Sequence, residues 1–267
     1  ADVLVCADDE DYFLLIEGLS SEEALRHFER HLPEELRPEI EELSSDYEVL
    51  SLHGPWAWEL LAHVLGADMI ALPYLNFFRI DQGWCVRAGK TGEFGYDIVV
   101  RRNAADELAS KLAREGDAWN LATVEPAAVS LCRFENWFFD PRHVPEGVTP
   151  LELQLQWRLD TSRSWVGREA IEARRARGIG RRLTCLVAMN ELAPKDPILL
   201  GERVIGEVTR AAHSPVRGEW IAAALVDVEW AHGGMEAFVA HSGRGTMAVR
   251  TVAPPLVDNR SLYVDPR

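Results

Sequence analysis

The stretch from residue 131 to residue 168 concentrates side chains that could bind a polar ligand. Glu135 lies within an apolar run at residues 131–139, where a buried carboxylate needs a partner that donates hydrogen bonds or carries a positive charge. A planar heterocycle with adjacent N–H and NH2 groups, such as a pterin or guanine, is one such partner. The ordinary alternative is an ion pair with Arg133 or Arg142, and these residues alone leave both readings open. The apolar neighbours of the carboxylate are Leu131, Phe134, Trp137, Phe138 and Phe139.

Composition bounds the class of protein. The chain has 267 residues, of which 47% are hydrophobic and 27% charged, which is typical of a soluble globular protein of one large domain or two. Its formal net charge of −15 argues against a nucleic-acid partner, because binding to phosphates needs a clustered basic surface. No apolar run approaches the roughly 18 residues that span a membrane, and no basic and apolar leader opens the sequence. We therefore expect a cytoplasmic protein without a membrane partner.

Several ligand sites are excluded by spacing. The four cysteines, at positions 6, 85, 132 and 185, lie far apart and form no C-x-x-C pair, so we expect reduced core thiols. Histidine, cysteine and acidic residues do not cluster at ligand spacing, and no metal site is predicted. Gly89-Lys90-Thr91 lacks the upstream glycine of a phosphate loop and leads into a strand, so we reject that interpretation. A flavin is not expected either, because no G-x-G-x-x-G follows a strand.

Short strands and helices must position the candidate residues in the first two thirds of the chain. Ser20 and Glu23 form a capping box for a helix that ends near residue 33. Pro55 is expected at the first position of a helix that Gly66 ends, and a long ordered loop is expected at residues 139–150. Strands are predicted at residues 2–6, 12–16, 47–52, 77–80, 83–86 and up to 100, and further helices at 104–114, 125–135 and 166–177.

The pattern changes after residue 180. Six short strands bounded by turns follow, which is typical of a β-sandwich or β-barrel. We therefore predict an α+β portion at residues 1–180, built of two intertwined lobes, and a small C-terminal β-barrel at residues 181–267. The expected strands span residues 182–189, 197–200, 203–209, 221–228, 237–240 and 246–251.

The order of the motifs resembles the folate-binding T-protein superfamily. This superfamily includes the aminomethyltransferase of the glycine cleavage system, tetrahydrofolate-dependent demethylases, and the folate-binding portions of dimethylglycine and sarcosine dehydrogenases. The resemblance extends over essentially the whole chain, and each motif is weak alone. The motifs include Asp2-Val-Leu-Val, Leu52-His53-Gly54-Pro55, Thr91-Gly92-Glu93-Phe94-Gly95-Tyr96-Asp97, Arg133-Phe134-Glu135, Thr149-Pro150-Leu151-Glu152, Trp157, Val166-Gly167-Arg168 and Gly206-Glu207-Val208-Thr209.

The resemblance implies a multi-lobed fold that holds tetrahydrofolate in a central cavity. The family's pterin-binding glutamate falls on Glu135, whose carboxylate can accept two edge N–H groups. The arginine for the glutamyl tail of folate falls near Arg163, and the catalytic aspartate falls on Asp2, where a carboxylate can manage a proton and stabilise a cationic intermediate. Lys90 and Trp157 fall on neighbouring motif positions and are also expected to contact the cofactor.

Departures from the family pattern affect the expected donor and partner. Lys90 replaces the family's tyrosine before Thr-Gly-Glu, and the bulky Trp137 and Phe138 would reshape the pocket. The family also has a further segment ahead of the position of Asp2. We expect either that the given sequence lacks this segment or that a partner subunit supplies it.

Two functions follow from the resemblance. The first is a tetrahydrofolate-dependent one-carbon transferase that moves a methyl, methylene or aminomethyl group between a small-molecule donor and folate. The alternative is a non-catalytic folate-binding subunit of a heteromeric demethylase, dehydrogenase or assembly complex. Relatives of the assembly type carry a Lys-Gly-Cys-Tyr signature, and Gly89-Lys90-Thr91-Gly92 stands in its place, which favours the enzyme.

Overall fold

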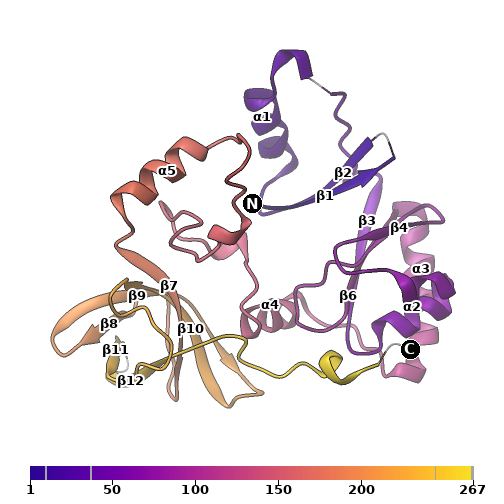
Figure 1. Cartoon of the computed structure of the whole chain (residues 1–267). Coiled ribbons are helices and arrows are strands. Elements are labelled where there is room, and N and C mark those ends of the chain that lie inside the picture. Colours follow the sequence, from indigo (N-terminus) through magenta and orange to yellow (C-terminus); the bar gives the residue numbers. More distant parts are fainter. Residues whose placement is uncertain (10, 37, 244, 266–267) are drawn as a thin grey trace. The chain divides into compact units, whose positions relative to one another are not determined.

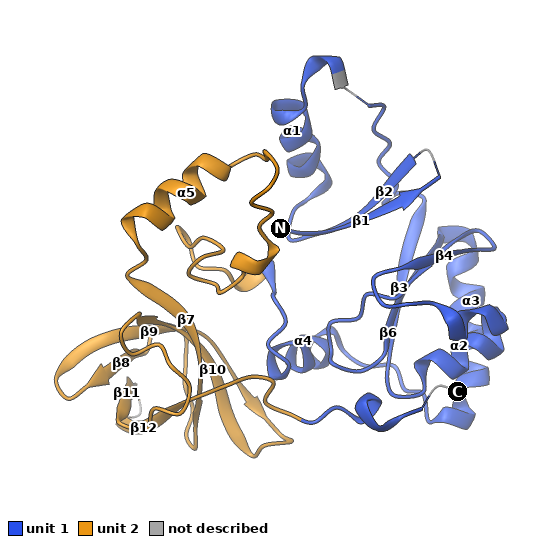
Figure 2. Cartoon of the chain, in the orientation of Figure 1, with its two compact units in different colours: residues 1–141, 258–267 blue, residues 142–257 orange. Residues whose placement is uncertain are grey.

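The structure of the chain is a computed structural model that describes residues 1–9, 11–36, 38–243 and 245–265. The chain forms two compact units (Figure 2). Unit 1 contains residues 1–141 and the C-terminal residues from 258 onward, and unit 2 contains residues 142–257. The sequence of unit 2 therefore lies between the two segments that form unit 1.

Unit 1 is built around a four-stranded antiparallel sheet (Figure 1). Its strands, in spatial order, are β3 (Tyr47–His53), β6 (Gly95–Arg101), β5 (Gly83–Val86) and β4 (Phe77–Ile80). Helices α2 (Ala57–Leu65) and α3 (Arg102–Gly116) cover one face through a core that includes Leu61, Tyr96 and Ile98. Alternation along β6 places Asp97 and Val99 on the opposite face.

A two-stranded antiparallel ribbon covers that opposite face. It consists of β1 (Asp2–Asp8) and β2 (Asp11–Glu17). Phe13 of the ribbon stacks on Trp84 of β5, with ring centroids 4.9 Å apart, and packs with Val99. The outward face of the ribbon is also apolar but exposed, with Val5 at 63% and Tyr12 at 71% exposure.

Two further helices complete unit 1. Helix α1 (Ser21–His31) follows the ribbon and begins with the predicted capping box, in which Ser20 and Glu23 bond each other reciprocally. Helix α4 (Pro126–Glu135) has proline at its start, as predicted, and its last turn buries Arg133 and Glu135. Short 3-10 helices occur in the two units at Glu34–Leu36, Ala67–Ala71, Asp117–Trp119, Pro141–His143, Gln156–Arg158 and Arg260–Tyr263.

Unit 2 contains a closed β-barrel. Its strands pair in the order β10-β7-β12-β11-β8-β9, and a core of aliphatic residues with Phe238 fills the interior. Helix α5 (Arg168–Arg177) precedes the barrel and ends at Gly178, as expected. The barrel strands are β7 (Arg181–Ala188), β8 (Pro197–Leu200), β9 (Arg203–Ser214), β10 (Glu219–Asp227), β11 (Phe238–Ser242) and β12 (Gly245–Val252).

The α+β class and the small C-terminal barrel are confirmed, with all six barrel strands where turn-bounded apolar runs predict them. One local prediction is wrong: Pro55 precedes helix α2, which begins at Ala57. The first barrel strand begins at Arg181, and residues 142–180 belong to the same compact unit as the barrel. The predicted domain bounds stay a prediction. The division of residues 1–180 into two lobes stays a prediction.

Candidate functional site

A cavity of about 290 Å³ lies in unit 1 and gathers most of its charged motif residues. Residues from the ribbon, from β3 and β6, from the loop before β6 and from α4 line it. A volume of this size is at the lower end of the range for small-molecule sites. The charged and titratable side chains in its wall are Asp2, Glu17, His53, Lys90, Asp97 and Arg133.

Four of these side chains form one network of alternating charge. The Nζ of Lys90 donates to Asp2 Oδ2 at 2.7 Å and to Glu17 Oε2 at 2.9 Å. Arg133 donates to both carboxylate oxygens of Glu17, and its Nη2 also donates to the carbonyl oxygen of Phe139 at 2.7 Å. The Arg133 side chain is only 7% exposed and that of Asp2 12%, so water screens these pairs little. The network fixes the carboxylate of Asp2 in the cavity wall.

Electrostatics keeps Glu17 ionised. Burial alone would raise the pKa of its carboxyl group, but hydrogen bonds and charges from Arg133 and Lys90 outweigh burial and lower the pKa below its usual value. Glu17 therefore remains a carboxylate at neutral pH and holds both cations in place.

The loop that carries Lys90 is held by close backbone packing. The amide of Gly89 donates to the carbonyl oxygen of Gly95 at 3.1 Å, and a Cβ on either glycine would come within 2.5 Å of the other's Cα. Gly92 has φ +82°, and a Cβ there would lie 2.4 Å from Asn136 Oδ1. Asn136 in turn donates to the carbonyl oxygen of Thr91 at 2.8 Å. The glycines thus permit contacts that fix the position of Lys90.

The C-terminal residues of unit 1 anchor the same loop. Glu93 accepts hydrogen bonds from the backbone amides of Arg260 at 2.9 Å and Ser261 at 2.8 Å, and from the Ser261 hydroxyl. The amide of Phe94 donates to Ser261 Oγ at 2.9 Å, and Asn259 donates to Asn136 at 2.6 Å. Residues 259–261 therefore close a ring of hydrogen bonds around residues 91–94.

His53 and Asp97 form the floor of the cavity on the central sheet. Burial lowers the pKa of His53, an effect that nearby Asp97 opposes and Arg133 reinforces. The imidazole is thus neutral at pH 7, and its Nδ1 lies 3.4 Å from Thr91 Oγ1. Asp97 accepts a hydrogen bond from the hydroxyl of Ser51, its partner on β3, at 2.5 Å.

Glu135 lies on the last turn of α4, two residues after Arg133, and is only 4% exposed. Burial among apolar neighbours is what the sequence predicts. Arg133 donates to Glu17 and to the carbonyl oxygen of Phe139, and the two ion pairs considered for Glu135 both stay open. Whether Glu135 binds a pterin stays a prediction.

Arg163 and Trp157 belong to unit 2, and both are exposed. The Arg163 side chain is 85% exposed and lies 3.5 Å from Asp160 Oδ2, and Trp157 is 74% exposed with the Arg158 guanidinium over its ring. Their expected contacts with folate stay predictions.

The Thr149 to Glu152 motif has a structural role within unit 2. Glu152 is 3% exposed, accepts from the Thr149 amide at 3.0 Å and pairs with Arg174 Nη2 at 2.5 Å. It ties the segment before α5 to that helix.

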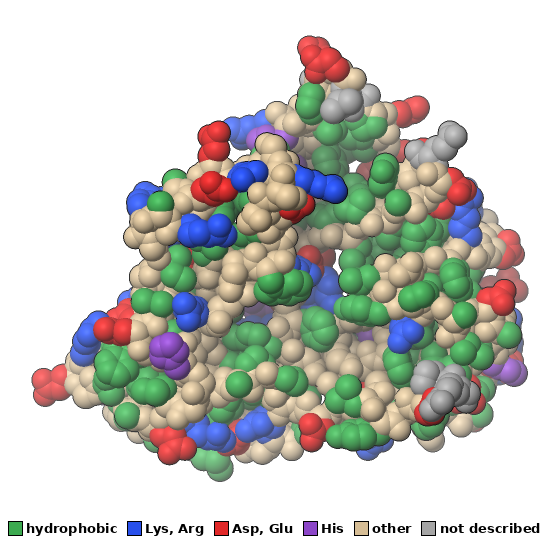
Figure 3. Space-filling view, viewed as in Figure 1, with side chains coloured by type: hydrophobic (Ala, Val, Ile, Leu, Met, Phe, Trp, Pro, Cys, Tyr) green, Lys and Arg blue, Asp and Glu red, His purple; other side chains and the backbone are tan. Residues whose placement is uncertain are grey.

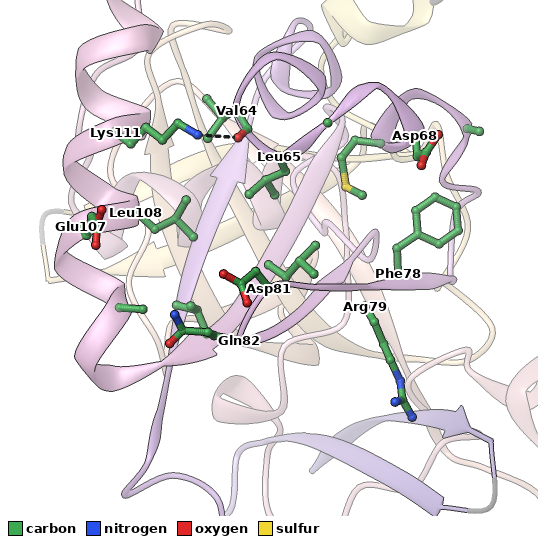
Figure 4. Close-up of a pocket in the computed structure, with 16 residues that line it drawn as sticks. Val64, Leu65, Asp68, Phe78, Arg79, Asp81, Gln82, Glu107, Leu108 and Lys111 are labelled. Carbon is green, nitrogen blue, oxygen red and sulfur yellow. Dashed lines mark hydrogen bonds between the residues drawn. The ribbon is translucent and has the colours of Figure 1, made fainter.

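A larger concavity of about 860 Å³ lies elsewhere in unit 1, between α2, α3 and the β4–β5 hairpin (Figure 4). Its two basic side chains are directed to other partners: Lys111 donates to the carbonyl oxygen of Val64 at 2.8 Å, and Arg79 pairs with Asp8 on the ribbon. Its carboxylates, such as those of Asp81 and Glu107, are exposed. The smaller cavity contains a network of charged side chains that could bind a polar ligand, and we place the candidate site there.

Cysteine chemistry does not fit the described site. Cys85 and Cys185 are buried free thiols, and burial raises the pKa of each to about 12, so neither is a thiolate at neutral pH. Within the described residues, no group of three or more potential metal ligands lies together. Nor is any helix in those ranges long and apolar enough to cross a bilayer. On the face shown in Figure 3, acidic and basic side chains are interspersed.

Sequence reasoning from motifs missed Glu17 and Asp97 as site residues. Asp97 is the only acidic residue in the strand Gly95–Arg101, whose residues 98–100 are buried, and this break in an apolar run is a usable signal. Glu17 carries no comparable signal, because its partner Arg133 lies 116 positions away.

Comparisons with known proteins agree with this architecture. The family described as GCVT N-terminal domain matches residues 1–163, and the glycine cleavage T-protein C-terminal barrel domain matches residues 181–258. Curated relatives include an aminomethyltransferase from Rubrobacter xylanophilus, 27% identical over 249 residues, and one from Bacillus mycoides, 26% identical over 236 residues. These matches cover 89% and 84% of this chain but 65% and 63% of the relatives, so the chain spans less than two thirds of their length.

A solved structure has a similar fold. The glycine cleavage system aminomethyltransferase T from Bartonella henselae matches with a TM-score of 0.69 and 24% sequence identity. The match covers 80% of this chain and 60% of that one.

Proposed function

The chain belongs to the glycine cleavage T-protein family, and on that premise we propose that it takes part in tetrahydrofolate-dependent one-carbon transfer. The observation that carries the proposal is the cavity in which Lys90 holds the carboxylate of Asp2 beside the helix that buries Glu135. The family relationship suggests the reaction class, and the charged cavity offers a place for it.

The residues present fit a reduced folate. A buried carboxylate such as Glu135, 4% exposed, suits the paired N–H and NH2 groups of a pterin edge, because a charged acceptor strengthens both hydrogen bonds. Folate would supply the nitrogen that accepts or donates the one-carbon unit. Arg163 and Trp157 are proposed to contact the rest of the cofactor, and their exposed side chains are accessible to such a ligand.

Asp2 is proposed to act at the reacting centre. Its carboxylate accepts a hydrogen bond from Lys90 at 2.7 Å, which fixes its orientation. A fixed carboxylate can take up a proton or stabilise a developing positive charge without reorganisation. Lys90 is proposed to position Asp2 and Glu17, and its expected contact with the cofactor stays a proposal.

The second candidate function is a folate-binding subunit without chemistry of its own, located like the enzyme in the cytoplasm. The exposed apolar face of the ribbon, which includes Val3, Val5, Tyr12 and Leu14, supports the proposal that further polypeptide covers this side of the site. Because the chain spans 63–65% of its curated relatives, the activity of the whole protein is a proposal under both functions.

Calorimetric titration with reduced folate tests the cofactor assignment. Wild type should bind, and Glu135→Ala should bind several-fold to a hundredfold more weakly if a charge-assisted pair of about 1.5–3 kcal/mol is lost. Glu107→Ala, an exposed glutamate of unit 1 outside the cavity, is the matched control and should bind like wild type. Equal affinity for wild type and Glu135→Ala would refute the pterin assignment.

Turnover separates the two functions. Conversion of folate to a one-carbon derivative, lost in Asp2→Asn with folate affinity retained, is expected of the enzyme. Folate binding without turnover, whichever one-carbon donor is supplied, would favour the binding subunit.

A further inference from the structure

The larger concavity of unit 1, which we call the groove, has an apolar floor. It lies between α2, α3 and the β4–β5 hairpin and has a volume of about 860 Å³ (Figure 4). Leu65, Phe78, Ile80 and Leu108 line it, and each is half-buried. Strand β4 is an edge strand that pairs only with β5 within the described residues. Part of the sheet face that α2 and α3 cover therefore stays accessible over this hairpin.

Three carboxylates surround this floor, and each comes from a different element. Asp68 lies on the 3-10 helix Ala67–Ala71, Asp81 on the turn between β4 and β5, and Glu107 on α3 (Figure 4). All three residues are exposed. The described part of the chain provides no ion pair and no side-chain hydrogen bond to any of them. Their charges are thus available to a ligand.

The two cations in the wall of the groove are directed away from these carboxylates. Lys111 follows Glu107 by four positions on α3, which is the spacing of an ordinary helical ion pair. Its Nζ instead donates to a carbonyl oxygen in the last turn of α2 at 2.8 Å. Arg79 pairs with two aspartates of the ribbon and its turn, Asp8 at 2.8 Å and Asp9 at 3.2 Å. The groove therefore presents uncompensated negative charge around an apolar surface.

This arrangement indicates the kind of occupant. A metal ion needs several oxygen ligands at one point, and the described residues provide no such group. Carboxylates on three separate elements instead suit cations spaced along a chain, and the apolar floor suits an apolar side chain between those cations. With a net charge of −15, a second copy of this chain is a poor electrostatic match. The complementary occupant is a basic segment of another protein.

We propose that the groove binds a segment of a partner protein in which basic side chains flank apolar ones. The basic side chains pair with Asp68, Asp81 and Glu107, and the apolar ones pack on Phe78 and Leu108. Exposed pairs of this kind set selectivity and association rate, while the apolar contact supplies affinity. The inference goes beyond the proposed function and does not depend on it, because the groove and the smaller cavity share no lining residue.

Three synthetic peptides of equal length test the chemistry of the occupant. The probe peptide has lysines on both sides of a leucine pair. In the first control peptide glutamates replace the lysines, and in the second serines replace the leucines. Titration of the full chain at physiological ionic strength, followed by NMR, should show the probe binding about tenfold more tightly than either control, because each control lacks one kind of contact. Equal affinity for the probe and either control would overturn the proposal.

Variants that remove charge locate the binding surface. The double variant Asp81→Asn/Glu107→Gln should bind the probe about fivefold more weakly, because each exposed charge contributes modestly. The control double variant Glu202→Gln/Glu236→Gln removes the same charge from exposed positions of unit 2 and should bind the probe like wild type. Equal losses in the two double variants would indicate attraction to net charge alone and would overturn the proposal.

Chemical shifts give the location independently of any substitution. In the wild type, the probe should shift the backbone amide signals of Asp68, Asp81 and Glu107 more than those of Lys90 and Arg163. Shifts centred on the smaller cavity or on unit 2 would contradict the assignment of the groove.

Sedimentation tests the competing occupant, a second copy of the chain. Wild type and Asp81→Asn/Glu107→Gln should sediment with the same mass. A wild-type dimer that this double variant dissociates would assign the groove to a second copy and would overturn the proposal of a different partner.

Discussion

Asp2 and Glu17 lie directly opposite each other across the β1–β2 ribbon as Cα partners. Two like charges in opposite positions destabilise an antiparallel pair. Lys90 removes this repulsion, because its Nζ lies within 2.9 Å of an oxygen of each carboxylate. The first and last residues of the ribbon are thus joined through a side chain from the loop between β5 and β6.

Substitution of this lysine should lower stability in a pH-dependent way. Lys90→Met is expected to reduce the free energy of unfolding by about 1–3 kcal/mol at pH 7, because two part-buried carboxylates lose a shared donor. The pKa of Glu17 lies below its usual value, so its ionic contribution is present above that value and is lost as pH falls through the lower folded pKa. The loss caused by Lys90→Met should therefore shrink at pH 3.5.

Urea unfolding at the two pH values measures this effect. Lys195→Met is the control, because Lys195 pairs with Glu207 on the surface and is 83% exposed. Such a pair contributes about 0–1 kcal/mol. An equal loss for Lys90→Met at pH 7 and pH 3.5 would contradict the charge argument.

His53 should make unfolding sensitive to pH near neutrality. Burial lowers its pKa below the ordinary value of 6.5. The unfolded state therefore binds a proton first as pH falls, and stability declines from about pH 7.5 downward until the folded state also titrates. In His53→Gln this part of the decline should disappear, as seen in urea midpoints between pH 5 and 8, whereas His27→Gln, at an exposed site, should leave it intact.

A pair of glycines separates backbone strain from crowding. Gly92 (φ +82°) and Gly218 (φ +66°) both have left-handed backbone, but only at Gly92 would a Cβ meet other atoms, 2.4 Å from Asn136 Oδ1. Gly218→Ala should cost about 1 kcal/mol from backbone strain alone. Gly92→Ala should cost at least about 1 kcal/mol more, since crowding in a packed site adds about 1–3 kcal/mol. Similar losses of thermal stability in the two variants would show that the loop yields easily.

Ser261 should protect the loop from local opening. Its hydroxyl accepts from the Phe94 amide at 2.9 Å and donates to Glu93. Ser261→Ala should cost about 0.5–1.5 kcal/mol for each hydrogen bond lost and should speed hydrogen exchange at the Phe94 amide. Ser164→Ala, at an exposed site, is the control. Unchanged exchange at Phe94 would argue against the anchoring role.

Local patterns predicted the elements well. The capping box at Ser20 and Glu23 and all six barrel strands follow from the sequence, because each depends on residues close together in the chain. Pro55 was misplaced because a turn of Gly54 and Trp56 delays the start of helix α2.

The site was predicted only in part. Resemblance placed Asp2 and Lys90, and the structure brings them into one cavity. The resemblance could not show that Lys90 binds Asp2, because the two residues are 88 positions apart. In addition, Lys90 stands where the family pattern has a tyrosine. Asp97 was missed for another reason: its importance lies in the charges around it, which depend on five separate elements.

The ring of hydrogen bonds around residues 91–94 also bears on protein synthesis. Phe94 and Ser261 are 167 positions apart, and the whole barrel sequence lies between them. The ribosome must therefore translate all of unit 2 before the loop bearing Lys90 can acquire its last partners. Until then, a nascent chain can fold its sheet and ribbon but leaves this loop without the backbone amides of Arg260 and Ser261. The hydrogen bonds that anchor residues 93 and 94 can therefore form only after the barrel sequence has been made.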